Sequence, residues 1–148
     1  MLNQVDFPLT NSQISEFILD KGYTTYFKLQ QALSEPLESG FIREESTHHR
    51  TFYHLTEDGA ETIHYFTNDI SPAIQHDIDE FLKEKHYELK NEMSVKADYF
   101  ENSNMEYSVR CQVIEQGLPL IDLTVTAPTE SEAATIANNW QKRNQEIY

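Results

Sequence analysis

The chain has 148 residues, 39% of them apolar, which is enough for one compact core or two small ones. It has no apolar run of about 18 residues, which excludes a transmembrane helix, and its start lacks the regions of a signal peptide. The single cysteine excludes an internal disulfide and favours the cytoplasm, while 25 acidic against 11 basic residues give a net charge of −14. One interpretation is that this acidity only keeps the protein soluble. If the protein binds DNA, its few cations must instead gather on one face.

Two helices are predicted in the first forty residues. Residues 13–21 carry apolar side chains at helical spacing, with Thr10 or Asn11 as the N-cap. A second helix, about residues 25–39, follows a cap at Thr24 or Thr25 and presents one apolar stripe: Tyr26, Leu29, Leu33 and Leu37. Pro36 lies inside this helix and is expected to bend it near Leu33.

A hairpin and two more helices are predicted next. Residues 41–56 contain two short strands around a polar tip, and Thr56 caps a helix with acidic residues in its first turn. Ser71 and Pro72 start a longer helix that runs to about Asn91.

The remaining chain changes to the alternation of strands. Residues 107–113 and 121–126 alternate apolar and polar side chains, and residues 95–100 are a weaker strand. Thr129 and Glu132 form a capping box for a last helix. The prediction is therefore an α+β chain with three parts: a module at 1–70, a linking or dimerisation helix at 71–92, and a small three-stranded antiparallel sheet with a C-terminal helix at 93–148.

The order of two helices and a hairpin carries a resemblance to known proteins. The helix end at 37–42 and the return strand at 52–59 resemble the winged helix of bacterial regulators of the multiple-antibiotic-resistance and phenolic-acid-decarboxylase repressor types. Residues 5–11 and 27–33 are similar to an uncharacterised bacterial family of predicted winged-helix regulators, a domain of unknown function, and this similarity extends over nearly the whole chain.

The resemblance implies a winged helix-turn-helix that binds DNA, with no operator or effector assigned. Proteins of that family usually begin with an apolar helix ahead of residues 5–11. Because this sequence starts almost at that stretch, the first helix of a three-helix core is expected to be missing or vestigial.

Given this fold, the helix at 25–39 is the recognition helix, whose N-terminal residues enter the major groove. Its outward positions are predicted to be Thr24, Thr25, Lys28, Gln31 and Glu35. Thr and Gln can bond base edges, and Lys can bind a phosphate or a guanine. Tyr26 is either a base contact or core, and the alternative for Lys28 and Gln31 is an ordinary solvated face.

The wing at 41–56 supplies the remaining predicted DNA contacts: Arg43, His48, His49 and Arg50. The two histidines add positive charge below about pH 6.5. The competing interpretation is a metal site, but neither a cysteine nor a histidine at i+4 completes a ligand set. No metal or cofactor is therefore predicted, and His64, His76 and His86 are scattered surface residues.

No enzyme signature is found in the sequence. There is no Gly-x-Ser-x-Gly elbow, no phosphate-binding glycine loop and no Cys-x-x-Cys pair, and Cys111 is expected to be inert core in an alternating strand. The chain is therefore not expected to be an enzyme.

A homodimer is predicted because the long helix has more apolar surface than the small wing needs. The expected interface consists of Ile74, Ile78, Phe81, Leu82 and Leu89. The alternative is a monomer in which the C-terminal sheet folds back on this stripe.

The first functional hypothesis is a DNA-binding transcriptional regulator, and the second is a winged-helix module that binds a protein partner. A continuous positive strip favours DNA; it would consist of Lys28, Arg43, His48, His49 and Arg50. Carboxylates that interrupt the strip favour the partner; they would come from Glu35, Glu44 and Glu45.

Overall fold

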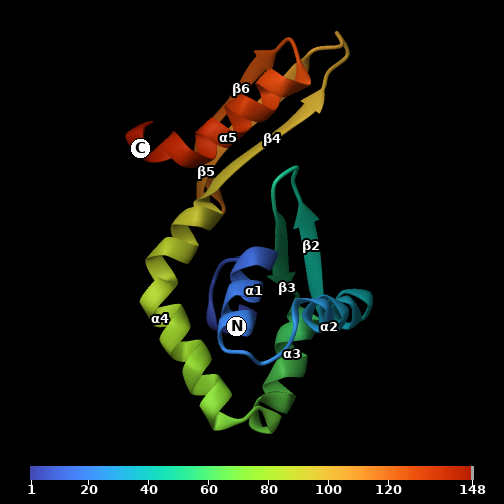
Figure 1. Cartoon of the computed structure of the whole chain (residues 1–148), viewed down its shortest axis with the longest axis vertical. Helices are drawn as coiled ribbons and strands as arrows, with labels where there is room; N and C mark the ends of the chain where they lie inside the picture. The colour runs from blue at the N-terminus through green and yellow to red at the C-terminus, as the bar shows by residue number, and fades with distance from the viewer. Residues whose placement is uncertain (148) are drawn as a thin grey trace. The chain divides into compact units, whose positions relative to one another are not determined.

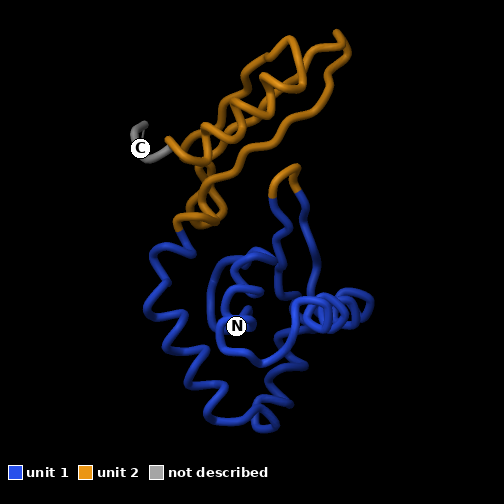
Figure 2. Tube along the Cα trace, in the orientation of Figure 1, with its two compact units in different colours: residues 1–46, 50–90 blue, residues 47–49, 91–148 orange. Residues whose placement is uncertain are grey.

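The computed structural model describes residues 1–147 and the side chains of residues 1–143 (Figure 1). These residues form an α+β fold with five α-helices and two three-stranded antiparallel sheets. They divide into two compact units (Figure 2). The first unit contains residues 1–46 and 50–90, and the second contains residues 47–49 and the chain from Asn91 on.

The first unit has the predicted order of two helices, a hairpin and a further helix. Thr10, Thr25 and Thr56 cap α1, α2 and α3 with their side chains, as their sequence positions predict. The elements are η1 (Leu2–Gln4), β1 (Leu9–Thr10), α1 (Asn11–Asp20), α2 (Tyr26–Glu38), β2 (Ile42–Ser46), β3 (Thr51–Leu55), α3 (Glu57–Phe66), η2 (Thr67–Asp69) and α4 (Pro72–Ser94), the last of which crosses into the second unit.

The first residues of the chain form little regular structure. Residues 2–4 form only a single turn of 3₁₀ helix. The sequence patterns did not predict β1, which pairs with β3 and makes the hairpin a three-stranded sheet of order β1-β3-β2. Helix α2 continues through Pro36 to Glu38.

Both α1 and α2 end in the same glycine motif. Gly22 and Gly40 have φ of 68° and 72°, the left-handed conformation that glycine adopts at low cost. After α2, the Gly40 N–H donates to Leu37 O and the Phe41 N–H donates to Pro36 O, which satisfies the last carbonyls of the helix. The chain therefore leaves α2 in a fixed direction and enters β2 directly.

The backbone carbonyl of Phe41 also holds the start of α3. It accepts hydrogen bonds from the Thr56 backbone N–H, at 3.0 Å, and from Thr56 Oγ1, at 2.9 Å. Gly59, in the first turn of α3, lies so close that a Cβ there would be 2.0 Å from the Phe41 carbonyl oxygen. The C-terminal end of α2 and the N-terminal end of α3 therefore meet at one residue, Phe41.

Helix α4 contributes to the core of the first unit. Leu82 and Leu89 are 6% and 3% exposed and belong to one cluster with Leu9, Ile14 and Leu29. The long helix therefore covers β1, α1 and α2.

This packing corrects the expected dimer interface. Of the five residues predicted there, Leu82 and Leu89 are buried within the chain, Ile78 and Phe81 pack partly buried against the same cluster, and Ile74 is half-buried. The alternative expected the C-terminal sheet to cover this stripe, whereas residues of the first unit cover it. The homodimer itself stays a prediction. The apolar period showed that this face is buried, but not that its partner is the same chain.

The second unit contains the predicted sheet and C-terminal helix. Its elements are β4 (Val95–Glu101), β5 (Tyr107–Glu115), β6 (Leu118–Ala127) and α5 (Glu130–Ile147), with sheet order β4-β5-β6. Thr129 and Glu132 form the predicted capping contact at the start of α5, with Thr129 Oγ1 donating to Glu132 Oε2 at 2.9 Å. The long helix, predicted as a separate link at 71–92, instead belongs to the first unit as far as Lys90.

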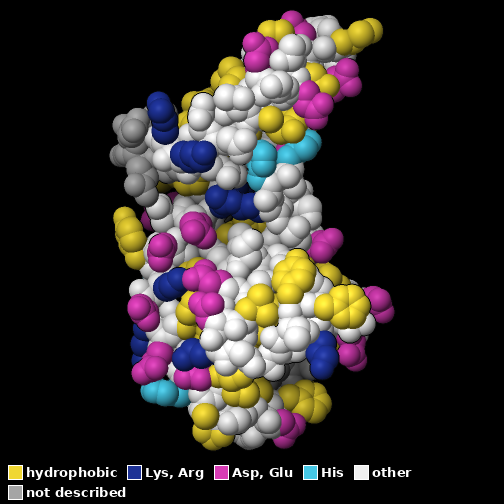
Figure 3. All heavy atoms as spheres, viewed as in Figure 1, with side chains coloured by type: hydrophobic (Ala, Val, Ile, Leu, Met, Phe, Trp, Pro, Cys, Tyr) yellow, Lys and Arg dark blue, Asp and Glu magenta, His cyan; other side chains and the backbone are white. Residues whose placement is uncertain are grey.

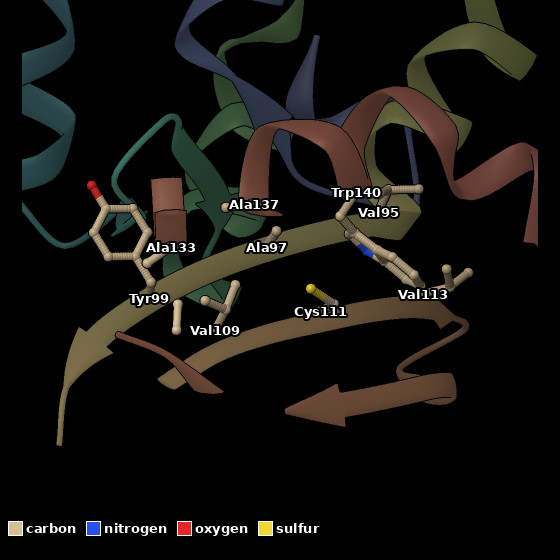
Figure 4. Close-up of a cluster of buried hydrophobic side chains, with 10 residues drawn as sticks. Val95, Ala97, Tyr99, Val109, Cys111, Val113, Ala133, Ala137 and Trp140 are labelled. Atoms are coloured by element: carbon tan, nitrogen blue, oxygen red, sulfur yellow. The ribbon is translucent and has the colours of Figure 1, made fainter. Parts of the chain in front are cut away.

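The core of the second unit lies between α5 and the strands β4 and β5. The labelled side chains of the two strands point toward the helix in Figure 4, and Cys111 is among them, 1% exposed as predicted. Ala133 and Ala137 are fully buried, and these small side chains let α5 lie close to the sheet. Trp140 donates its Nε1–H to Gln112 O at 3.1 Å, so its buried polar atom is satisfied.

Candidate functional site

The first turn of α2 is the most exposed apolar surface of the two N-terminal helices. Leu29 is 7% exposed in the core, whereas Tyr26 and Phe27 are 57% and 71% exposed. Lys28 and Gln31 are exposed as well, as predicted. Tyr26 is therefore not core, which resolves the alternative that its place on the apolar stripe left open.

The two threonines before α2 have different roles. Thr25 is exposed and its Oγ1 accepts from the Lys28 N–H at 3.4 Å, so its hydroxyl is occupied as the helix cap. Thr24 is half-buried. Phe27 was not among the predicted site residues, although its signal was present in the sequence: it is an aromatic residue outside the apolar stripe of its helix.

Amide hydrogen bonds fix α2 against α1 and the sheet. Asn11 Nδ2 donates to Gln30 Oε1 at 2.8 Å and lies 3.0 Å from the hydroxyl of Tyr53 on β3. Gln30 Nε2 donates back to Asn11 Oδ1 at 3.2 Å. Because amide pairs are directional, they set the angle at which α2 presents its outer face.

The turn between α1 and α2 is attached to α4. Asp77 accepts from Tyr23 Oη and from Lys21 Nζ, the latter at 3.2 Å. The hydrogen bond from Tyr23, followed by that from Lys21, holds the pKa of Asp77 below its ordinary value. The helix that covers the core thus also holds the turn ahead of α2.

We expect Tyr23→Phe to raise the pKa of Asp77 toward its ordinary value, because it removes the largest contribution to the shift. A carboxyl whose pKa is lowered by folding stabilises the fold above its unfolded pKa, and this contribution is lost as pH falls through the folded pKa. A carbon-13 NMR titration of the carboxyl measures the shift, and Lys21→Met is expected to raise the pKa as well. An unchanged Asp77 titration in Tyr23→Phe would contradict this assignment.

The hairpin carries the other predicted contacts, and acidic residues lie among them. Arg43 is exposed and stands opposite His54, whose Nε2 lies 3.0 Å from Glu45 Oε2. Glu44, between Arg43 and Glu45, is exposed. Arg50 is half-buried at the base of the tip.

The hairpin tip, Thr47–His49, groups with the second unit. There His48 Nδ1 is paired with the carboxylate of Asp98, and the His48 ring stacks on Tyr99 with centroids 3.9 Å apart. His49 is exposed and its N–H donates to Thr47 Oγ1 at 3.4 Å. His48 therefore has an acidic partner within the chain.

The face drawn in Figure 3 shows how the charges are distributed. In the lower part of this view, the lysine and arginine side chains lie among acidic ones. Glu44 and Glu45 are among the carboxylates expected to interrupt a positive strip, and both lie directly beside Arg43 in the hairpin. Within the described part of the chain, no three His, Cys, Asp or Glu side chains gather in a way that could hold a metal ion.

Comparison with known proteins gives one match. The model of a family described as a domain of unknown function, DUF4364, matches residues 1–148. No curated protein and no solved structure matches the chain. Among the described helices, none has both the length and the apolar character needed to cross a membrane.

Proposed function

The chain belongs to the DUF4364 family, a domain of unknown function, and we propose that it is a cytoplasmic, DNA-binding transcriptional regulator with a winged helix. In this proposal α2 is the recognition helix and the hairpin β2–β3 is the wing. The observation that carries the proposal is the exposed first turn of α2, held at a fixed angle by the Asn11–Gln30 pair. An α-helix with a free outer face fits the major groove of DNA.

The connection between the helices supports this proposal. Helices α1 and α2 are joined by a short turn that contains Gly22, which is typical of a helix-turn-helix. The hairpin follows α2 directly and forms a small sheet with β1. The two helices and the hairpin follow one another as in a winged helix, and this succession supports the proposal.

The charge of these elements also differs from that of the rest. Over residues 26–38 and 42–55 there are three basic and four acidic side chains, whereas the whole chain has 11 and 25. These segments are therefore less acidic than the chain as a whole, although their net charge is not positive. DNA binding is accordingly expected to be modest and steeply dependent on salt.

We expect Lys28→Ala and Arg43→Ala each to flatten the dependence of log affinity on log salt by roughly one for each phosphate that the variant no longer neutralises. Both side chains are exposed, one on α2 and one on β2. Fluorescence anisotropy with fragments of the promoter region of the protein's own gene, over a series of salt concentrations, measures the slope. Lys83→Ala on α4 makes the same charge change on an exposed side chain outside the site, and its slope should equal that of the parent.

Absence of binding to these fragments at low salt would refute the DNA-binding proposal. Equal slopes for Lys28→Ala, Arg43→Ala and Lys83→Ala would refute the assignment of α2 and the hairpin as the interface. These two failures are distinguishable, because the first concerns the activity and the second its location.

The second candidate function is a winged-helix module that binds a protein. Two observations favour it: Tyr26 and Phe27 expose aromatic surface on α2, and Glu44 and Glu45 follow Arg43 in β2, which makes the hairpin less suited to a phosphate backbone. Aromatic side chains are enriched at protein interfaces, whereas charged ones are depleted from their centres. If DNA binding is absent at low salt, this function becomes the preferred one.

A further inference from the structure

Strand β6 forms an open edge of the second sheet. It pairs with β5 on one side only, and the part of the chain that the structure describes supplies no strand on its other side. An edge strand presents unpaired backbone N–H and C=O groups to any strand that can align with it. The free edge of β6 is long, since the strand runs from Leu118 to Ala127.

Helix α5 leaves the side chains of β6 largely uncovered. By register, Leu123 and Val125 stand opposite Cys111 and Val109, whose side chains are buried beneath α5. Yet Leu123 and Val125 are 41% and 39% exposed, and Ala127 is the one buried residue of β6. The covered face of the sheet therefore continues past α5 as an exposed apolar strip.

The same strand carries almost no charge, which distinguishes it in so acidic a chain. Its one ionisable side chain is Asp122, whose carboxylate accepts from Arg110 Nη2 at 2.7 Å and Nε at 3.0 Å and from Gln112 at 3.0 Å. The opposite edge strand, β4, carries Lys96, Asp98 and Glu101. Two copies of a chain with a charge of −14 repel each other, and β6 is where they can meet at little electrostatic cost.

The devices that usually block an edge are also absent from most of β6. Natural edge strands carry lysine, proline or a bulge that prevents pairing. Pro119 and the register shift at Val113/Ile114 lie at one end of the strand. The eight residues from Leu120 to Ala127 contain neither lysine nor proline.

We propose that β6 binds β6 of a second copy of this chain, antiparallel and across a two-fold axis, so that two three-stranded sheets become one. A two-fold axis perpendicular to the sheet keeps both α5 helices on the same face. Leu123 and Val125 of each copy then lie between the two helices. On the other face, Thr124 and Thr126 form cross-strand contacts with the partner copy, and Asp122 stays neutralised by its own Arg110. This interface does not depend on DNA binding.

The first test is the mass of the full chain by sedimentation equilibrium. We expect the parent to have twice the mass of the 17.3 kDa chain at micromolar concentration. Leu123→Glu with Val125→Glu should weaken the dimer by more than about tenfold, because it places like charges opposite each other in the interface. Far-UV circular dichroism shows whether the variant remains folded, as the exposure of both side chains predicts.

Phe100→Glu is the matched control, since Phe100 is 58% exposed on β4, the other edge of the same sheet. It should leave the dimer intact. A parent that stays at 17.3 kDa at all concentrations would overturn the proposal. If the variant Leu123→Glu with Val125→Glu remained a dimer, the assignment of the interface to β6 would be overturned. This conclusion holds whatever the mass of Phe100→Glu.

The second test locates the two-fold axis by disulfide formation. In an antiparallel strand pair around such an axis, one residue faces its own copy, and equivalent residues one position away are separated by roughly 7 Å more along the strand. Single cysteines introduced in turn at residues 120–126 should therefore form a disulfide-linked dimer at one position, with a sharp fall on both sides. The natural Cys111 is 1% exposed and does not compete. No maximum along the strand would contradict the pairing.

Discussion

Leu82→Ala should lower the free energy of unfolding of the first unit by about 2–5 kcal/mol, the usual cost of removing a buried leucine side chain. Leu82 is 6% exposed on α4 and packs in a cluster with Leu9, Ile14 and Leu29. Urea unfolding followed by far-UV circular dichroism measures the decrease. Trp140, the one tryptophan of the sequence, lies in the second unit, so its fluorescence follows that unit separately.

Tyr87→Ala is the control on the same helix. Tyr87 is 84% exposed, so its removal should change the free energy of unfolding by no more than about 0.5 kcal/mol. The comparison also separates the two roles considered for α4. If Leu82→Ala left stability unchanged but halved the mass in solution, the stripe would be an interface between copies and the intrachain packing would be refuted.

Gly59→Ala should destabilise the first unit by at least about 2 kcal/mol, although alanine normally stabilises a helix interior by about 1 kcal/mol relative to glycine. The added Cβ would lie 2.0 Å from the Phe41 carbonyl oxygen and 2.8 Å from the Phe41 carbonyl carbon. Both are backbone atoms, so relief of the clash requires α3 to move away from the junction of α2 and β2. Urea unfolding and thermal unfolding each measure the effect.

Glu61→Ala, at an exposed position of α3, controls for the change in helix propensity. We expect it to leave the free energy of unfolding within about 0.5 kcal/mol of the parent. A Gly59→Ala variant as stable as the parent would show that α3 and Phe41 are not in close contact.

The local elements were predictable because short-range signals determine them. A threonine N-cap before an apolar period places α1, α2 and α3, and alternation places β5 and β6. The strand β1 was missed because two residues, Leu9 and Thr10, are too few to show a period.

What an apolar face packs against was not predictable from the sequence. The stripe of α4 has the same spacing whether it covers its own core or a second copy, and the structure places it in its own core. Conversely, the apolar side chains of β6 follow the alternation of a half-buried strand, yet α5 leaves Leu123 and Val125 uncovered. The burial of a strand depends on how many strands the neighbouring helix covers, and the spacing of residues along one strand does not encode this.

The candidate site was predictable only where the period of a single helix determines which residues face outward. The outer positions Lys28 and Gln31 follow from the period of α2 and are exposed. The partners of the hairpin residues do not follow from it: His54 contacts Glu45 across the strand pair, and His48 contacts Asp98, fifty residues away. Such pairs depend on tertiary contacts, and they decide how much of the cationic character of the hairpin remains available.

The backbone groups of Phe41 also determine how the first unit can open locally. Its N–H donates to Pro36 O at the end of α2, and its carbonyl accepts from Thr56 at the start of α3, so both helix ends are bonded to the residue that precedes β2. Regions linked in this way open as one cooperative unit, whereas unlinked helix ends fray singly. The last turn of α2 and the first turn of α3 are therefore expected to lose their order together, which hydrogen exchange of their backbone amides would measure.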